Sequence, residues 1–484
     1  MIKFAVIADI HLTEWSDTVQ YDSFSFALNS IKASKVDAVV CLGDVTAYGE
    51  LSSANYFLER MKEINVPKLF ILGNSDKRSK KTAKEINIFQ TEKEMTIQQY
   101  RFIGINTSEE EISTEDAELL KTSDENTFVF MHHPPFWAMK PGSERILGDF
   151  QQNGKYKALI HGHMHYYEKK SAIYSIQALD PDKAIGEPPC VTYFTVDGDE
   201  INTDYDYFDV SMPEGIDNFL GLSCFEPEID IPYASENGLK NIELRPSAVY
   251  YDFEKLSKCV DIWRKKGGRY LSLHMPDFGY AGRLIGEKEW EDAIKIANAL
   301  AVDGVTVHVP KASLKLMNTD ARSVLLEFIT KKIKELPKEC KVGIENMHMT
   351  EKEKDDLERR FGYTPDECID FMNMINENFG FERVGVLLDI GHARNNAPFS
   401  EQYPVGVWYN KVGKYAVGYH IHQVEISDSG MENHVPIKSF YGPLISYCGF
   451  AHCWNNNKIN QRPLFLEIRG GYEKYSVSVK LLKR

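Results

Sequence analysis

The stretch Ile2-Lys3-Phe4-Ala5-Val6-Ile7-Ala8-Asp9-Ile10-His11 opens the chain and decides the fold of its first part. Its apolar run predicts a buried strand, and two metal-type side chains, Asp9 and His11, follow at the end of that strand. The two residues are two positions apart, so the period of a strand would send both side chains to one face. One strand is therefore expected to offer two ligands at its carboxyl end.

Further candidate ligands follow other buried-looking runs. They are Asp44 after 38–42, Asn74 after 69–72, His132 after 128–131, and His163 and His165 after 158–160. Open α/β sheets bind ligands at the carboxyl edge of their strands, so these side chains are expected to meet. Mixed Asp, Asn and His donors suit divalent ions such as Mn, Fe, Zn, Co or Ni. A bridging Asp44 would let two ions clamp a phosphate and activate a shared water as hydroxide.

The blocks DxH, GD, GN, HHPP and GHMH occur in this order and resemble those of the calcineurin-like metallophosphoesterase family. The resemblance implies a four-layer α/β sandwich with two metal ions. One ion would take Asp9, His11, Asp44 and His165, and the other would take Asp44, Asn74, His132 and His163. Asp44, Asn74 and His132 would then be catalytic as well as metal-binding.

One block departs from the family pattern. The family usually reads GNHD, whereas this chain reads Gly73-Asn74-Ser75-Asp76. Ser75 cannot act as a cationic proton donor, which favours esters with a good leaving group or protonation by another residue, such as His133 or His161. We therefore predict hydrolysis of a small phosphate ester, in particular a phosphodiester, with His133 as a further catalytic candidate.

The second half of the chain alternates short strand-like runs with helical stretches. The runs lie near 220–224, 242–244, 271–274, 305–309, 342–345, 384–389, 417–421 and 464–468, and helices are expected at 287–301, 314–336 and 472–482. Eight parallel strands with intervening helices in about 270 residues predict a (β/α)8 TIM barrel. The polar stretch 200–217 suggests a boundary that divides the chain into a domain of residues 1–205 and one of residues 206–484.

Metal-type residues lie at the ends of most of these strands, where TIM barrels place their active sites. They are His274, His308, Glu345, Asp389, His392, His420, His422 and Glu467, with His434 in a later loop. The pattern resembles the xylose isomerase-like barrel superfamily, which includes sugar epimerases and endonuclease IV. The resemblance implies a one-metal core in which two Glu residues move protons; this core is Glu345, Asp389, His420 and Glu467. Further ligands of the three-zinc endonuclease IV type match His274, His308, His392 and His434.

The barrel motifs leave several activities open. With one to three Zn or Mn ions, the barrel could isomerise or epimerise a sugar or polyol phosphate through an enediolate, or hydrolyse a second phosphoester. A DNA or RNA repair nuclease and a non-catalytic binding barrel are the alternatives. His274, His308 and His392 could instead contact substrate or support ligands. His422 is expected to contact substrate, and Glu243 and Arg245 to form a structural pair near the barrel wall.

Composition and charge narrow the range of substrates and partners that we expect. The 484 residues suit two domains, and 43% hydrophobic residues indicate a folded protein. A net charge of -15 disfavours nucleic acid and leaves small phosphate esters and sugars as the expected substrates. Eight cysteines without a CxxC motif suggest reduced thiols, and no apolar stretch is long enough to span a bilayer. We expect a cytoplasmic protein, and the sequence carries no signal for its oligomeric state.

Overall fold

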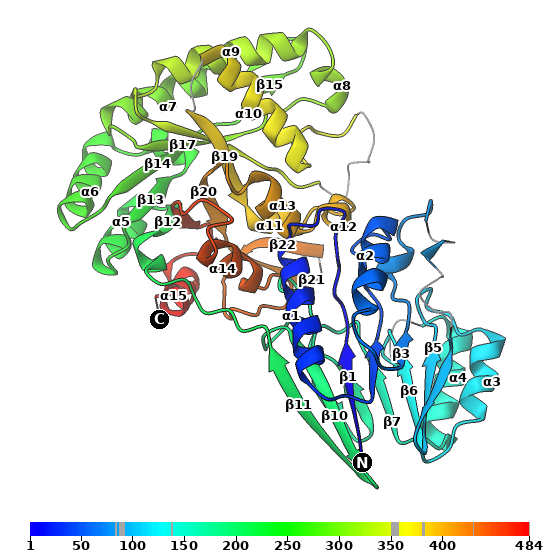
Figure 1. The fold of residues 1–484 in the computed structure, drawn as a ribbon. Coiled ribbons are helices and arrows are strands. Elements are labelled where there is room, and N and C mark those ends of the chain that lie inside the picture. Colours follow the sequence, from blue (N-terminus) through cyan, green and yellow to red (C-terminus); the bar gives the residue numbers. More distant parts are fainter. Residues whose placement is uncertain are drawn as a thin grey trace. The chain divides into compact units, whose positions relative to one another are not determined.

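The computed structural model describes residues 1–82, 85–86, 92–136, 139–349, 358–379, 383–428 and 430–483. These residues form two compact units (Figure 1). The first unit comprises Met1–Ser211 together with Tyr441–His452, and the second comprises Met212–Phe440 and Cys453–Arg484. The segment Tyr441–His452 thus belongs to the first unit, although the predicted division at residue 205 assigns it to the second domain. That division stays a prediction about the parts of the chain that fold by themselves.

Two β-sheets form the centre of the first unit. One contains β1 (Ile2–Ile7), β2 (Ala38–Cys41), β3 (Lys68–Phe70), β10 (Cys190–Asp197) and β11 (Glu200–Tyr207) in the order β11-β10-β1-β2-β3. The other contains β4 (Glu94–Ile97), β5 (Tyr100–Ile105), β6 (Thr127–Met131), β7 (Ala158–His161), β8 (Glu168–Lys170) and β9 (Ile173–Ser175) in the order β4-β5-β6-β7-β9-β8. β1, β2 and β3 run parallel, as do β5, β6 and β7, so each sheet gathers its carboxyl ends at one edge.

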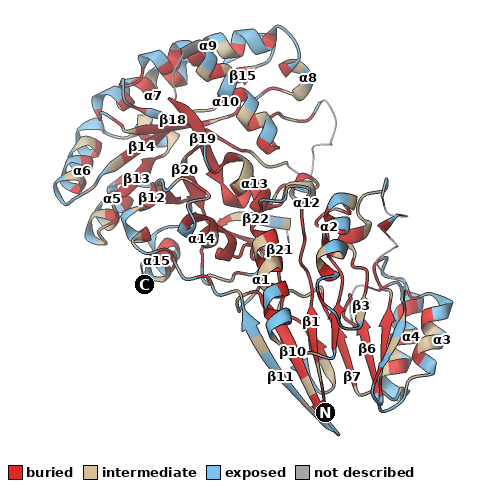
Figure 2. Ribbon diagram, viewed as in Figure 1, coloured by how far each residue is buried: buried red, intermediate tan, exposed pale blue. Residues whose placement is uncertain are grey.

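Aromatic side chains fill the space between the two sheets. The Phe4 ring stacks on Phe194 with ring centroids 5.1 Å apart and meets Phe102 edge-on at 4.9 Å. Most of these strands are also buried on their outer faces (Figure 2), because helices cover them. α1 (Val19–Ala33) and α2 (Leu51–Met61) pack on the first sheet, and α3 (Thr114–Lys121) and α4 (Pro141–Asn153) on the second. The predicted four-layer α/β sandwich is confirmed.

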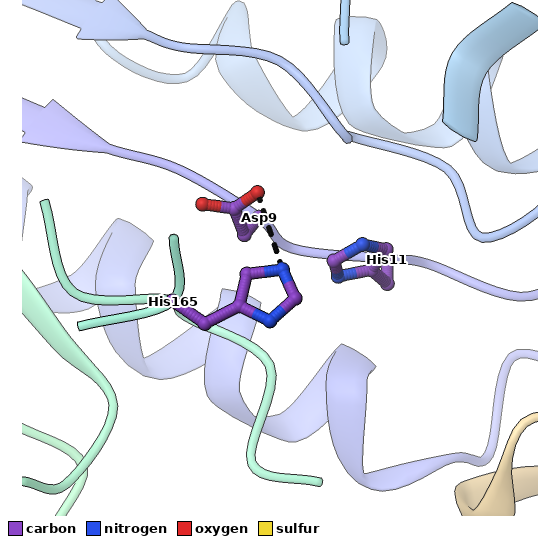
Figure 3. Close-up of side chains that lie close together, drawn as sticks. All are labelled: Asp9, His11 and His165. Carbon is purple, nitrogen blue, oxygen red and sulfur yellow. Dashed lines mark ion pairs between the residues drawn. The ribbon is translucent and has the colours of Figure 1, made fainter. Parts of the chain in front are cut away.

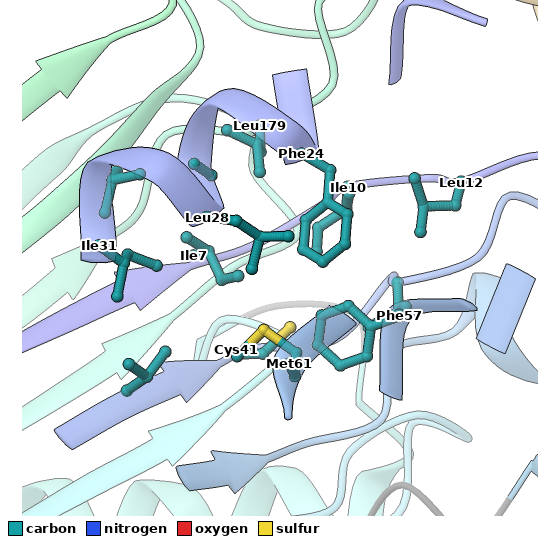
Figure 4. Close-up of a cluster of buried hydrophobic side chains, with 14 of the residues drawn as sticks. Ile7, Ile10, Leu12, Phe24, Leu28, Ile31, Cys41, Phe57, Met61 and Leu179 are labelled. Atoms are coloured by element: carbon teal, nitrogen blue, oxygen red, sulfur yellow. The ribbon is translucent and has the colours of Figure 1, made fainter. Parts of the chain in front are cut away.

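α1 covers the first sheet because its apolar residues recur at helical spacing. Phe24, Leu28 and Ile31 are four and three positions apart, which places them on one face of the helix. Figure 4 shows this face packed over Ile7 of β1, and the Phe24 ring lies 5.3 Å from the Phe57 ring of α2. Burial of this face fixes the helix on the sheet that carries the first candidate ligands.

The strand β11 runs through the predicted domain boundary at residue 205. Ile201, Thr203 and Tyr205 alternate with exposed acidic or polar residues and are half-buried. This alternation is typical of a strand with one face packed, so the acidic composition of the stretch did not indicate a linker. The first unit therefore extends to Ser211.

The second unit contains a closed barrel of eight parallel strands. These are β12 (Leu220–Cys224), β13 (Asn241–Leu244), β14 (Tyr270–His274), β17 (Gly304–His308), β18 (Lys341–Glu345), β19 (Val384–Asp389), β20 (Ala416–Ile421) and β23 (Leu464–Leu466). Each of the eight predicted runs forms one of them, so the TIM barrel is confirmed. Short hairpins pair β15 (Gly279–Tyr280) with β16 (Leu284–Ile285) and β21 (Gln423–Ser427) with β22 (Gly430–Val435).

Helices connect the barrel strands. The longer ones are α5 (Pro227–Glu236), α6 (Phe253–Lys265), α7 (Glu287–Ala299), α9 (Ala321–Glu335), α10 (Pro365–Phe379), α13 (Val405–Val412), α14 (Cys448–Asn455) and α15 (Tyr472–Leu482). Shorter ones are α8 (Leu314–Met317), α11 (Ile390–Arg394) and α12 (Phe399–Gln402), and 3-10 helices span Ile216–Asn218 and Pro246–Tyr250 in this unit and Ser75–Lys77 in the first unit.

The helix predicted over 314–336 is interrupted between α8 and α9. The Thr319 hydroxyl donates to the Leu316 carbonyl over 2.7 Å, and such local bonds compete with the regular helical pattern.

Among the described residues, no helix combines the length and the apolar character that crossing a bilayer requires.

Candidate metal centres

The candidate ligands of the first unit follow the carboxyl ends of five strands. Asp9 follows β1, Asp44 follows β2, Asn74 follows β3, His132 follows β6 and His163 follows β7. The two sheets bring these ends together, because the His163 backbone N–H donates to an Asp9 carboxylate oxygen over 3.0 Å. The site therefore lies where the carboxyl edges of both sheets meet.

Asp9 and His11 are not strand residues, so the period-two argument for their common direction is wrong. β1 ends at Ile7, and Asp9 and His11 have left-handed backbones with φ of 52° and 50°. The loop instead follows the turn after β2, since the backbone N–H groups of Ile10 and His11 both donate to the Asp44 carbonyl over 2.9 Å. A loop-to-loop interaction aims the two side chains.

The same backbone conformation recurs at other candidate ligands. Asp44 has φ of 50°, His163 of 69° and His165 of 61°. For residues with a side chain this region is strained by about 1–2 kcal/mol each. Such strain persists only where the surrounding structure enforces it, and it concentrates at functional sites.

All seven predicted residues converge. Ligand atoms of Asp9, Asp44 and His132 lie within 4.8 Å of one another, and so do those of Asp9, His11 and His165. Figure 3 shows the second group, in which His165 Nε2 lies 3.6 Å from Asp9 Oδ1. Asp44 lies between the two groups, with Oδ2 at 3.1 Å from His11 Nε2 and Oδ1 at 3.5 Å from His132 Nε2.

The proton positions indicate that a cation fits between His132 and Asn74. His132 Nδ1 lies 2.9 Å from the Leu42 carbonyl, which can only accept, so in the neutral ring this nitrogen carries the proton. His132 Nε2 then presents a lone pair to the Asn74 oxygen at 3.0 Å and lies 3.2 Å from His163 Nδ1. Lone pairs that face each other at these distances are the arrangement that a shared metal ion resolves.

The pKa values agree with this fit. Burial lowers the pKa of His163 to about 3, with further lowering by the neighbouring His132, and burial holds the pKa of His165 well below its usual value. Both rings are therefore neutral near pH 7, which is the metal-binding form. Burial raises the pKa of Asp9 to about 6, a shift that a nearby cation would oppose.

Sequence reasoning missed Asp180, which lies beside the site. His11 Nδ1 is 3.4 Å from Asp180 Oδ2, and the Gln20 amide donates to both Asp180 and Asp182 over 2.9 Å. Asp182 also accepts the Ser446 backbone N–H at its carbonyl over 3.1 Å. No motif marks these residues, because their role depends on the packing of the loop after β9 beside α1.

The structure shows the surroundings of Ser75, where the chain departs from the family pattern. Ser75 is fully buried, and its backbone N–H donates to Asp44 Oδ1 over 2.8 Å. The proton-donor candidates His133 and His161 are also buried, and burial lowers the pKa of each to about 4. In this environment both imidazoles are neutral at pH 7, so neither supplies the cationic acid that the family His would.

The candidate ligands of the barrel lie at its carboxyl rim. His274, His308, Glu345 and Asp389 are the last residues of β14, β17, β18 and β19, and Glu467 directly follows β23. Their positions follow from strand register, as expected for a TIM barrel. Sequence spacing alone therefore located this group.

Glu345 is the centre of the barrel cluster. Its Oε1 lies 3.1 Å from His420 Nδ1, and its Oε2 lies 3.1 Å from His274 Nε2 and 3.2 Å from His308 Nε2. Two tight groups of candidate ligands result, and Glu345 belongs to both. They are His274, His308 and Glu345, and Glu345, Asp389, His420 and Glu467.

A third group contains a residue that the ligand prediction leaves out. Asp389, His422 and His434 have ligand atoms within 4.8 Å of one another, and His422 Nε2 lies 3.1 Å from Asp389 Oδ1. His392, predicted as a ligand, lies in none of the tight groups found among the described residues. Its Nδ1 faces the Asn346 carbonyl at 3.1 Å and lies 3.5 Å from Asp389.

Glu243 and Arg245 form the predicted pair, with Arg245 Nη1 3.8 Å from Glu243 Oε2, but both residues also contact the candidate ligands. The Glu243 carboxylate is fully buried in the barrel and accepts from His420 Nε2 over 2.7 Å, while Arg245 lies 2.9 Å from Glu467. Burial lowers the pKa of His420, but Glu243, Glu467 and Glu345 outweigh burial and hold that pKa well above its usual value. The surplus of buried carboxylates fits a cation at His420 Nδ1 in place of a proton.

A further carboxylate orients His308. Asp277 Oδ1 lies 2.6 Å from His308 Nδ1, and Asp277 Oδ2 lies 2.6 Å from Lys311 Nζ. A carboxylate on the remote nitrogen fixes the tautomer that presents Nε2 to a metal. The sequence offered a weak signal, because Asp277 follows the end of β14 by three positions.

Two family models match separate stretches of the chain. Residues 232–476 match the xylose isomerase-like TIM barrel, and residues 2–167 match the calcineurin-like phosphoesterase. A probable cyclic nucleotide phosphodiesterase of Xenorhabdus bovienii is 30% identical over 84 residues, or 16% of this chain. The chain spans about a third of that curated relative, since the match covers 34% of its length.

Solved structures resemble one unit or the other. A D-tagatose 3-epimerase-like protein is 18% identical with a TM-score of 0.39, covering 55% of this chain and 95% of its own. Endonuclease IV from Thermus thermophilus is 14% identical with a TM-score of 0.38, covering 55% and 97%. A dimetal phosphatase from Danio rerio is 14% identical with a TM-score of 0.34, covering 43% and 96%.

Proposed function

We propose that this chain, which belongs to the xylose isomerase-like TIM barrel family and carries a calcineurin-like phosphoesterase domain ahead of the barrel, is a bifunctional metal-dependent enzyme. Its first unit hydrolyses a small phosphate ester, in particular a phosphodiester. Its barrel acts on a related sugar or polyol phosphate, as an isomerase or epimerase or as a second hydrolase.

The lone pair of His132 Nε2, which faces the Asn74 oxygen at 3.0 Å, carries the proposal for the first unit. Two divalent ions, of Mn, Fe, Zn, Co or Ni, would lie on either side of Asp44, whose two oxygens face His11 and His132. Bound there, the pair would supply Lewis-acid stabilisation of the phosphate and acidify a water molecule. The residues of the chain hold the ions and orient the ester, so no protein nucleophile is required.

The surroundings of the first centre support a diester or another ester with a good leaving group. His133 and His161 have pKa values lowered to about 4 by burial, so neither is a strong proton donor at neutral pH. Phe136 is 54% exposed and lies 5.9 Å from the His161 ring, where it offers an aromatic face to an organic substituent.

Hydrolysis of bis-p-nitrophenyl phosphate with Mn or Zn tests this proposal. Asp44→Asn is expected to lower the rate by at least about 10³-fold, because it removes the carboxylate between the two ions. The matched control is Asp149→Asn, an exposed residue of α4, which should change the rate less than about twofold. A folded Asp44→Asn variant with undiminished activity, or wild-type protein without esterase activity, would refute the proposal.

The buried carboxylates around His420 carry the proposal for the barrel. Three overlapping groups favour more than one Zn or Mn ion, and Glu345 and Glu467 are the residues proposed to move protons. Elemental analysis separates the cases: three ions per chain would fit a one-metal barrel beside the dinuclear centre, and five would fit a trinuclear one. Two ions would leave the barrel as a binding module.

The reaction class of the barrel follows from deuterium incorporation. With the Asp44→Asn protein, in which the first centre is disabled, a sugar phosphate incubated in D2O gains a C–D bond if the barrel exchanges a carbon-bound proton, whereas hydrolysis by the barrel releases phosphate without exchange. Glu345→Gln should abolish whichever signal appears. Cleavage of an abasic DNA duplex would instead support the nuclease alternative, which the net charge of -15 disfavours.

A further inference from the structure

A cavity of about 780 Å³ opens at the end of the barrel opposite to the metal ligands. Its lining includes residues that begin or directly precede barrel strands, such as Tyr270 of β14 and Ala416 of β20. The candidate ligands lie at the other ends of these parallel strands. The cavity is therefore separate from the proposed reaction centre of the barrel.

Four cationic side chains from four strand entrances line this cavity. They are Arg269 before β14, Lys341 at the start of β18, Lys414 before β20 and Arg462 before β23. None of the described residues that line the cavity is acidic. This local charge contrasts with the net charge of -15 of the whole chain and makes the cavity attractive to anions.

Two of the cations are not engaged by the surrounding chain. Arg269 and Arg462 are exposed, and within the described residues neither guanidinium has a hydrogen bond or an ion pair. The nearby acid Asp303 is held elsewhere, since it accepts the Leu271 backbone N–H over 2.9 Å. The N–H donors of both guanidinium groups are therefore available to a ligand.

Three amide side chains of the cavity are structural by contrast. The Asn241 side chain donates to the Leu220 carbonyl over 3.2 Å, Asn376 donates to the Val384 carbonyl over 2.9 Å, and Asn460 donates to the Lys414 carbonyl over 2.7 Å. These bonds fix the strand entrances relative to one another. The strand entrances that carry the cations are thus held in place, whereas the exposed side chains of Arg269 and Arg462 can turn toward an anion in the cavity.

We propose that this cavity binds a small phosphate-bearing polyanion through Arg269 and Arg462. Guanidinium groups match phosphate in charge and in bidentate geometry, and the volume lies within the range of small-ligand sites. Tyr415, which is 48% exposed and lines the same cavity, offers an aromatic face to an organic group attached to the phosphates. The site is independent of the activity proposed for either metal centre.

Equilibrium dialysis with labelled methylenediphosphonate tests the proposal, because its P–C–P bridge resists hydrolysis. The metal centres also attract this probe, so the informative quantity is the difference between variants of the metal-loaded full-length protein. The double variant Arg269→Gln and Arg462→Gln should lose one bound equivalent per chain, or bind that equivalent at least about tenfold more weakly. Arg322→Gln, which removes an exposed cation elsewhere in the same unit, is the matched control and should retain it.

A second pair of variants keeps the proposal open to refutation if the first pair alters folding. Lys341→Gln with Lys414→Gln removes the other two cations and should also weaken binding. Parallel dialysis with labelled ADP and adenosine reports on the organic part, and adenosine alone should not bind the cavity. Equal binding of the diphosphonate by wild type and both double variants would overturn the proposal.

Discussion

The two candidate metal centres place similar side chains by different means. In the first unit, Asp9, His11 and Asp44 have left-handed backbones in loops beyond the strand ends. In the barrel, His274 and Glu345 are regular terminal residues of strands. Loop conformation thus sets the first centre, and sheet register sets most of the second, in which His434 is the exception with φ of 63°.

This difference shows where each centre is vulnerable. Glycines crowd the first centre, since a Cβ on Gly43 would lie 2.4 Å from the Gly73 backbone nitrogen, and one on Gly73 would lie 2.1 Å from Asp44 Oδ1. The barrel centre depends instead on charge balance, because Glu243 and Glu467 are buried in the cluster and the half-buried Arg245 contacts Glu467. Backbone changes should damage the first centre, and charge changes the second.

The largest expected effect is on the barrel and comes from Glu345→Gln. Glu345 belongs to two ligand groups, so its loss should remove at least one metal equivalent and lower any barrel activity by at least about 10³-fold. Phosphodiesterase activity of the first unit should remain within about twofold. Elemental analysis and the esterase assay measure both, with the exposed Glu339→Gln as control. A parallel loss of esterase activity would break the separation of the two centres.

Gly73→Ala tests the dependence of the first centre on its backbone. The new methyl group would collide with the Asp44 side chain, so we expect a destabilisation of about 2–4 kcal/mol and loss of esterase activity. Thermal unfolding and metal content measure the result. An active variant with unchanged metal content would show that the loops adjust more freely than their close contacts suggest.

Asp180→Asn and Asp277→Asn compare the supports of the two centres. Each carboxylate faces Nδ1 of a candidate ligand, His11 at 3.4 Å and His308 at 2.6 Å. Such supports are worth about 10–100-fold in metal affinity, and the shorter contact should carry the larger loss. Competition with a metal-binding dye measures both affinities. A larger effect of Asp180→Asn would reverse this ranking.

Gly148→Ala gives the smallest effect and serves as the control for Gly73→Ala. Gly148 lies within α4, and an added Cβ would have no neighbour within 4 Å among the described residues. Alanine in a helix interior is favoured over glycine, so we expect a gain of about 0.5–1 kcal/mol in the free energy of unfolding. Denaturant titration should show this gain with unchanged esterase activity. A loss of stability would indicate that the helix surface is covered.

The same difference explains what the sequence can predict. All eight barrel strands are predictable, because each is a buried apolar run whose last residues point to the rim. The direction of Asp9 and His11 is not, since it depends on hydrogen bonds to the Asp44 carbonyl from a loop distant in sequence. The sequence does not predict that Glu243 contacts His420, because only closure of the barrel brings the Glu243 carboxylate 2.7 Å from His420 Nε2.

Residues that contact the candidate ligands only through tertiary packing are not marked by a sequence motif. Asp180 acts on His11 through a loop that packs near α1, and Gln20 of that helix completes the contact. Ser75 is recognisable as a departure, but its complete burial follows only from the fold. Most of the residues that converge in these clusters are thus marked by pattern, with His422 as an exception, whereas Asp180, which faces His11, is not.

Because Tyr441–His452 belongs to the first unit, dividing the chain at one position does not separate the two units. His452 Nε2 lies 2.9 Å from an Asp22 carboxylate oxygen, and the Ser446 backbone donates to Asp182, which Gln20 connects to Asp180. A protein truncated after Ser211 would therefore lack part of the packing behind its own metal centre. Recombination that exchanged only the barrel would have to carry this segment along or replace it.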